Sequence, residues 1–94
     1  MPKYLIVRNF DRISDDELAV LAQSSKRVAI ERFPDVKWLH SHVVVDAKGV
    51  VRTYCVYLAP TEDLVREHAA AFGGHVIDDI SEIASDVDPE EILV

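Results

Sequence analysis

The chain has 94 residues, 49% of them hydrophobic, and a formal net charge of −7. This length predicts a single domain, since domains usually run from about 50 to 250 residues, and the apolar content excludes wholesale disorder. The negative charge argues against nucleic acid and anionic membrane as partners, because both attract basic patches.

The one cysteine, Cys55, cannot form an intramolecular disulfide, which predicts a reduced, cytoplasmic setting. The N-terminal sequence MPKYLIVRNF lacks the layout of a signal peptide. No apolar run reaches the roughly 20 residues that a membrane span needs. We therefore expect a soluble cytoplasmic protein.

The first two elements are a strand and a helix. Residues 3–10, KYLIVRNF, are rich in β-branched and aromatic side chains, which favour a strand. Ser14, with Glu17 three residues later, makes a capping box that begins a helix. This helix is expected to end near Arg32, because the residue before Pro34 disfavours the helical conformation.

Two further strands follow as a hairpin. They are predicted at residues 36–45 and 50–59, and the sequence DAKG between them has the residues of a tight turn. Gly49 in this turn is free to adopt a positive φ.

A second helix and a last strand complete the domain. Thr61 is the expected N-cap of the helix, and Gly73 and the glycine after it end the helix. Residues 75–84 return as a fourth strand. We therefore predict one domain at residues 1–84 and an acidic C-terminal tail at residues 85–94.

The order of elements is β-α-β-β-α-β, which predicts an α+β, ferredoxin-like sandwich. In this plan a four-stranded antiparallel sheet carries two helices on one face. The other face of the sheet is bare, and in so small a domain a bare apolar face is commonly covered by a second copy or by a ligand. We expect a homodimer.

The hairpin collects side chains that can bind a metal, so the direction in which they point matters. Side chains alternate along a strand. With a turn of two or four residues, one face carries a set with several polar members, and the opposite face, with Val43, Val45 and Tyr54, is more apolar. We assign the apolar set to the helices. The open face or dimer interface then receives Trp38, His40, His42, Cys55 and Tyr57. A turn of odd length would move Cys55 away from the histidines.

His40 and His42 on one strand place two imidazoles about 6.5 to 7 Å apart at Cα on the same side, close enough to bind one ion. Cys55 would add a thiolate at cross-strand distance. Imidazole with thiolate suits zinc, nickel or copper far better than magnesium or calcium. Binding should weaken below about pH 6, because the ligands must lose their protons.

The alternative for these residues is structural. Histidine and cysteine on a half-buried strand are more often packed or hydrogen-bonded than bound to metal, and a single His-x-His is a weak motif. His68 lies among apolar helical neighbours, which indicates a buried core histidine.

Other chemistries find little support in the sequence. No glycine-rich phosphate loop follows a strand, no serine lies in a nucleophile elbow, and the RNA-binding pattern of aromatic residues is absent. No catalytic residue is predicted.

Three segments, in order after an MPKYLIVR-type opening, resemble a known family: WLHSHV at 38–43, TYCVYLAP at 53–60 and VREHA at 65–69. The chain is similar, to about Glu82, to the small nickel-binding ferredoxin-like domain family, long catalogued as a domain of unknown function. The resemblance implies a homodimer and a Ni(II) site that uses histidines. The positions that match the family pattern are Trp38, Ser41, Tyr54, Cys55, Tyr57, Pro60, Glu67 and His68.

The sequence therefore predicts a soluble dimeric protein that binds nickel, or zinc or copper instead, for sequestration or sensing. The candidate ligands are His40, His42 and Cys55, with His68 added by the resemblance. Trp38, Tyr54 and Tyr57 are predicted to line a pocket or the dimer face.

Two alternatives remain open at this stage. One is a small-molecule isomerase or oxygenase, which a closed apolar cavity of roughly 300 Å³ or more at the dimer interface would favour. The other is a non-catalytic dimerisation or regulatory module.

Overall fold

The computed structural model describes residues 1–93, so Val94, the end of the predicted tail, lies outside the described residues. Its elements are β1 (Lys3–Asp11), α1 (Asp15–Arg32), β2 (Lys37–Val45), β3 (Val51–Leu58), α2 (Glu62–Phe72), β4 (Val76–Glu82) and the short 3-10 helix η1 (Pro89–Glu91). No helix among the described residues is long and apolar enough to cross a membrane.

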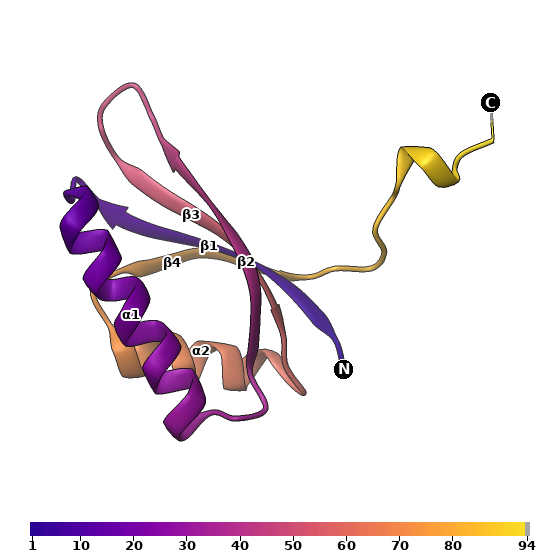
Figure 1. Ribbon diagram of the computed structural model, residues 1–94, viewed down its shortest axis with the longest axis horizontal. Helices are drawn as coiled ribbons and strands as arrows, with labels where there is room; N and C mark the ends of the chain where they lie inside the picture. The colour runs from indigo at the N-terminus through magenta and orange to yellow at the C-terminus, as the bar shows by residue number, and fades with distance from the viewer. Residues whose placement is uncertain (94) are drawn as a thin grey trace.

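The strands form one antiparallel sheet in the order β2-β3-β1-β4, so β2 and β4 are its edges. Both helices lie on the same side of the sheet (Figure 1). The order β-α-β-β-α-β and this arrangement confirm the predicted ferredoxin-like fold.

The helix starts follow from local side-chain chemistry. The Ser14 hydroxyl accepts a hydrogen bond from the Glu17 backbone N–H at 3.1 Å, and the Glu17 carboxylate accepts one from the Ser14 N–H at 3.1 Å. Thr61 caps α2 by accepting from the Leu64 N–H at 3.2 Å. These bonds satisfy N–H groups that the first turn of a helix leaves free.

The turn of the hairpin has an odd length, and this reverses the predicted facing of β3. Residues 46–50 join the two strands, and Val45 pairs with Val51. The register also shifts between Trp38 and His40, where Leu39 forms a bulge. The prediction that Trp38, Cys55 and Tyr57 share the open face with the histidines was wrong, because both features change which residues stand opposite one another.

The helix-covered face is built by alternate residues of the central strands. On β3 these are Val51, Thr53, Cys55 and Tyr57, and on β1 they are Tyr4, Ile6, Arg8 and Phe10, all buried. Trp38 and Ser41 pair with Tyr57 and Cys55 and so join this face. His40, His42 and Tyr54 lie on the open face.

The core lies between this covered face and α2. It consists of Tyr4, Ile6, Val36, Cys55, Tyr57, Ala59 and Val65. Helix α1 contributes less, since only Ser25 and Ala29 of its residues are buried. After β4 the chain leaves the domain and extends away from the sheet (Figure 1), with an ion pair between Lys3 and Asp86 near its start.

Candidate functional site

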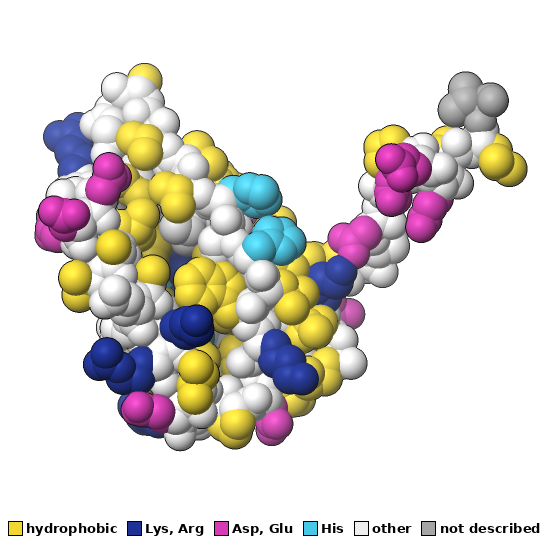
Figure 2. Space-filling model, in the orientation of Figure 1, with side chains coloured by type: hydrophobic (Ala, Val, Ile, Leu, Met, Phe, Trp, Pro, Cys, Tyr) yellow, Lys and Arg dark blue, Asp and Glu magenta, His cyan; other side chains and the backbone are white. Residues whose placement is uncertain are grey.

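The open face carries a pair of adjacent histidines on edge strand β2. The ring centroids of His40 and His42 lie 5.4 Å apart, with the ring planes at 78°. Both residues are exposed, and two histidine side chains lie side by side on the surface in Figure 2 (cyan). The bulge at Leu39 leaves this pair on the open face, as predicted, while it turns Trp38 to the other face.

A stripe of apolar side chains runs beside the histidines across the open face. Tyr54 stands opposite His42, and Val56 stands opposite His40. Leu5 and Val7 of β1 pair with Val56 and Tyr54, so the stripe continues across three strands. All four are only half-buried. An apolar stripe of this kind on a sheet is typical of a surface that meets a partner.

The donor set on this face fits part of a metal shell. Two imidazoles offer nitrogen donors that nickel, copper and zinc accept. Within residues 1–93 no three His, Cys, Asp or Glu side chains gather closely enough to hold an ion. Two positions of a shell are therefore supplied by this chain, and the others are available to water or to a second molecule.

Cys55 does not join the histidines. It is 4% exposed on the covered face, and its Sγ–H donates to Thr53 Oγ1 at 3.2 Å. The sheet separates it from the imidazoles of β2. A strand-centre thiol in such surroundings behaves as a small packed residue.

His68 is fully buried on α2, as its apolar neighbours predict. Its Nε2–H donates to the Ser25 carbonyl at 2.9 Å, while Nδ1 has no partner among the described residues. Burial lowers the pKa of His68, and the positive charge of Arg8 lowers it further. A metal ion at Nδ1 would sit near that same buried cation, which opposes binding.

Arg8, on strand β1, is the residue that the sequence analysis missed. It is 1% exposed, and its guanidinium lies 5.2 Å from the ring centroid of Tyr57 and 5.1 Å from that of Phe72. Its Nη1–H donates to His75 Nε2 at 2.9 Å. The signal was present in the sequence, because Arg8 alternates with Tyr4, Ile6 and Phe10 and so belongs to a buried face.

His75 is the neutral acceptor of that bond. Its Nδ1–H donates to the Gly73 carbonyl at 2.8 Å, which leaves Nε2 as an acceptor for Arg8. Burial lowers the pKa of His75, and the Arg8 charge adds to that effect. The ring also stacks between Phe72, at 4.6 Å, and Phe10, at 5.1 Å. His75 is thus part of the packing around Arg8 and not the solvated residue that its position after two glycines suggests.

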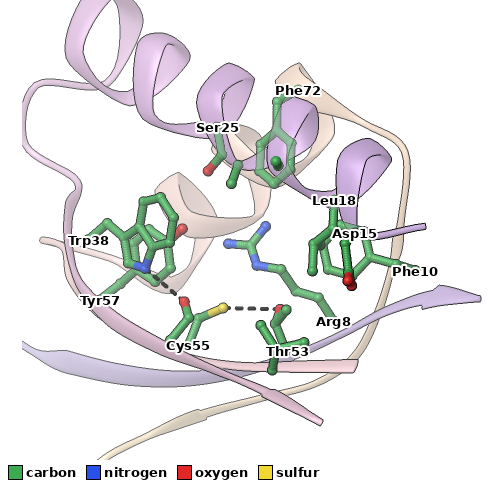
Figure 3. A pocket seen from close by; sticks show the side chains of 14 residues that line it. Arg8, Phe10, Asp15, Leu18, Ser25, Trp38, Thr53, Cys55, Tyr57 and Phe72 are labelled. Carbon is green, nitrogen blue, oxygen red and sulfur yellow. Dashed lines mark hydrogen bonds between the residues drawn. The ribbon is translucent and has the colours of Figure 1, made fainter. Parts of the chain in front are cut away.

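A cavity of about 430 Å³ opens beside Arg8, between α1 and the sheet. Figure 3 shows the guanidinium pointing into the space between Trp38, Ser25 and Phe72. The Trp38 ring stacks on Tyr57 with centroids 6.2 Å apart, and its Nε1–H donates to Ser41 Oγ at 2.8 Å. Trp38 and Tyr57 therefore do line a pocket, but it lies on the covered face, whereas Tyr54 lies on the open one.

Comparison with known proteins gives the family. Residues 4–83 match the model of the family described as nickel responsive protein SCO4226-like. The chain belongs to the SCO4226-like family. This agrees with the resemblance found in the sequence to a small nickel-binding, ferredoxin-like domain family. No curated protein matches the chain by sequence.

Two solved structures share the fold of this SCO4226-like chain. SCO4226 from Streptomyces coelicolor A3(2) is similar at 23% identity and a TM-score of 0.67, over 90% of this chain and 99% of that one. The C-terminal domain of the MgtC protein from Mycobacterium tuberculosis is similar at 10% identity and a TM-score of 0.60, over 90% and 88% of the two chains. At these identities the likeness concerns the fold alone.

Proposed function

We propose that this protein binds a transition-metal ion, nickel in the first place, through His40 and His42, for sequestration or sensing. The observation that carries the proposal is the exposed imidazole pair, with ring centroids 5.4 Å apart on one face of β2. The description of its family as nickel responsive supports nickel over zinc and copper, which the same nitrogen donors would also accept.

We further propose that two copies of the chain pack through the open face. The stripe of Leu5, Val7, Tyr54 and Val56 supports this, since these side chains are only half-buried in one chain. A second copy related by two-fold symmetry would present the same stripe and a second histidine pair. Donors from that copy, or water, would then complete the shell.

The metal proposal is tested by calorimetric titration of the tag-free protein with Ni(II), Zn(II) and Cu(II). The double variant His40→Ala/His42→Ala should lose binding by at least about a hundredfold, because two of the ligands are gone. Cys55→Ala is the matched control and should bind as the native protein does, since Cys55 lies on the other face. Binding that survives the double variant, or is lost in Cys55→Ala, would contradict the assignment.

The dimer proposal is tested separately by sedimentation. Val56→Glu places a charge in the centre of the apolar stripe and should convert a dimer to monomers. Val20→Glu, at an exposed position of α1, makes the same chemical change on a different surface and should leave the dimer intact. A native protein that sediments as a monomer at all concentrations would sink this part of the proposal and leave water as the source of the remaining donors.

A further inference from the structure

The cavity beneath α1 contains a buried positive charge without a counter-charge. An arginine keeps its charge at physiological pH, and Arg8 is 1% exposed. Within residues 1–93 the ion pairs involve other residues, and no carboxylate lies within ion-pair distance of Arg8. A buried charge is costly unless it is paired and hydrogen-bonded.

Two of the Arg8 donors have no acceptor. Nη1 bonds to His75, but neither Nε nor Nη2 finds a partner among the described residues. Nε–H and the Nη2 group lie along the same edge of a guanidinium, and that edge matches the two oxygens of a carboxylate. The unsatisfied donors therefore have the arrangement that binds a carboxylate side-on.

The rest of the cavity suits an apolar ligand body. Its volume of about 430 Å³ lies within the range of small-molecule sites, roughly 300 to 1,000 Å³. Most of its lining is apolar or aromatic, with Phe10, Leu18, Trp38, Tyr57 and Phe72 among the larger side chains. Figure 3 shows them around the space into which the guanidinium points.

The charge balance favours a monoanion. Arg8 is the one basic side chain of the lining, and the lining also includes the carboxylate of Asp15, which lies beside Phe10 and Leu18 in Figure 3. A dianionic phosphate would meet one cation and one like charge, whereas a carboxylate needs only the free edge of Arg8.

We propose that this cavity binds a small carboxylic acid with an aromatic or aliphatic body, its carboxylate on the Nε and Nη2 edge of Arg8. Both nitrogens are closed off from bulk water, so a ligand reaches them when a wall of the cavity yields. Helix α1 is that wall, since it buries only Ser25 and Ala29. This site is separate from the histidine pair, which lies on the other face of the sheet.

Trp38, the only tryptophan of the chain, lines the cavity and reports its occupancy. The experiment titrates the protein with benzoate, phenylacetate, 3-phenylpropionate, hexanoate and octanoate, each beside its uncharged primary amide, and follows Trp38 fluorescence. At least one acid should give a saturable change with a Kd below about 1 mM, and its amide should bind at least about tenfold more weakly, because a charge-assisted bidentate contact is lost. The Arg8 Nε–H resonance should shift with the acid and not with the amide.

Variants place the effect at Arg8. Arg8→Gln should weaken acid binding by at least about tenfold, and Arg8→Lys by less, since a lysine keeps the charge but loses the fork. Arg52→Gln, on the open face of the same sheet, and His40→Ala/His42→Ala should change nothing. If Arg8→Gln does not fold, the contrast between acid and amide and the Arg8 resonance in the native protein still decide the matter.

Three results would overturn this proposal: no acid of the panel binds, acids and amides bind alike, or acid binding is unchanged in Arg8→Gln. None of these outcomes bears on nickel binding, which is measured at the other face. Conversely, a failure of nickel to bind leaves the carboxylate site untouched.

Discussion

The two faces of the sheet differ in a way that runs against the usual binary pattern. The face beneath the helices contains Arg8, Thr53 and Ser41, whereas the solvent-facing side carries Leu5, Val7, Val56 and Leu58. An apolar residue on a bare face and a charged residue on a covered face both call for an external group. The comparison teaches that this small domain has two unsatisfied surfaces of opposite character, one proposed for a second chain and a metal, the other for an organic anion.

The largest expected difference between the faces concerns two tyrosines of the same strand. Tyr57 is 1% exposed on the covered face, so Tyr57→Ala should lower the free energy of unfolding by about 3–5 kcal/mol. Tyr54→Ala, three residues earlier on the open face, should cost less than about 1 kcal/mol. Chemical denaturation, at a concentration where sedimentation shows one species, measures both. Equal losses would mean that the two faces are not distinguished by burial as described.

The next effect is the protection of Cys55 from thiol reagents. Because Cys55 is 4% exposed beneath the helices, its labelling by a disulfide reagent should be at least about a hundredfold slower in the folded than in the unfolded protein. A thiol on the open face would instead react at a rate close to that of the unfolded chain. Labelling kinetics at several denaturant concentrations separate the two cases.

A smaller effect should follow from weakening the helix that covers the cavity. Ser14→Ala removes the side-chain half of the capping box of α1 and should lower the free energy of unfolding by about 1 kcal/mol. Nickel binding should not change, because α1 does not touch the open face. If Ser14→Ala alters metal affinity by more than about twofold, the faces are coupled and the comparison between them must be revised.

The last effect is a gradual dependence of stability on pH. The pKa of both His68 and His75 is lowered from the ordinary value of 6.5, chiefly by burial and further by the charge of Arg8. Below about pH 6.5 the unfolded chain takes up protons at these histidines that the folded chain refuses, so the free energy of unfolding should fall as pH drops from 7 toward 5.

Denaturation of the metal-free protein at pH 7, 6 and 5 measures this decline. His68→Gln should flatten it in part, because one of the two buried groups is removed, while His40→Ala/His42→Ala at the exposed pair should not. A stability that is constant over this range would contradict the buried, neutral state of His68 and His75.

Local sequence signals were enough for the fold. The capping box at Ser14, the cap at Thr61 and the turn glycine Gly49 each act within a few residues, and the structure has a helix or turn at each of these places. Gly49 and Gly73 do adopt positive φ values, of 81° and 63°. Such signals depend on neighbours in the chain, so they can be interpreted without tertiary contacts.

The candidate sites depended on a different kind of information. Whether Cys55 shares a face with His40 turns on one residue more or less in the hairpin turn and on the bulge at Leu39. A single-residue change in register moves every side chain of a strand to the opposite face. The rule that the more apolar set faces the helices also failed, because Arg8 and Thr53 lie on the covered face.

The sequence by itself thus determined the order of elements, the fold, the family and the histidine pair, because helix caps, strand composition and i, i+2 spacing are local properties of the chain. Only the tertiary structure decided that Cys55 and Tyr57 lie beneath the helices and that Arg8 has no counter-charge. Burial and pairing are relations between segments far apart in sequence, and Arg8, His75, Trp38 and Phe72 meet only when the sheet is complete.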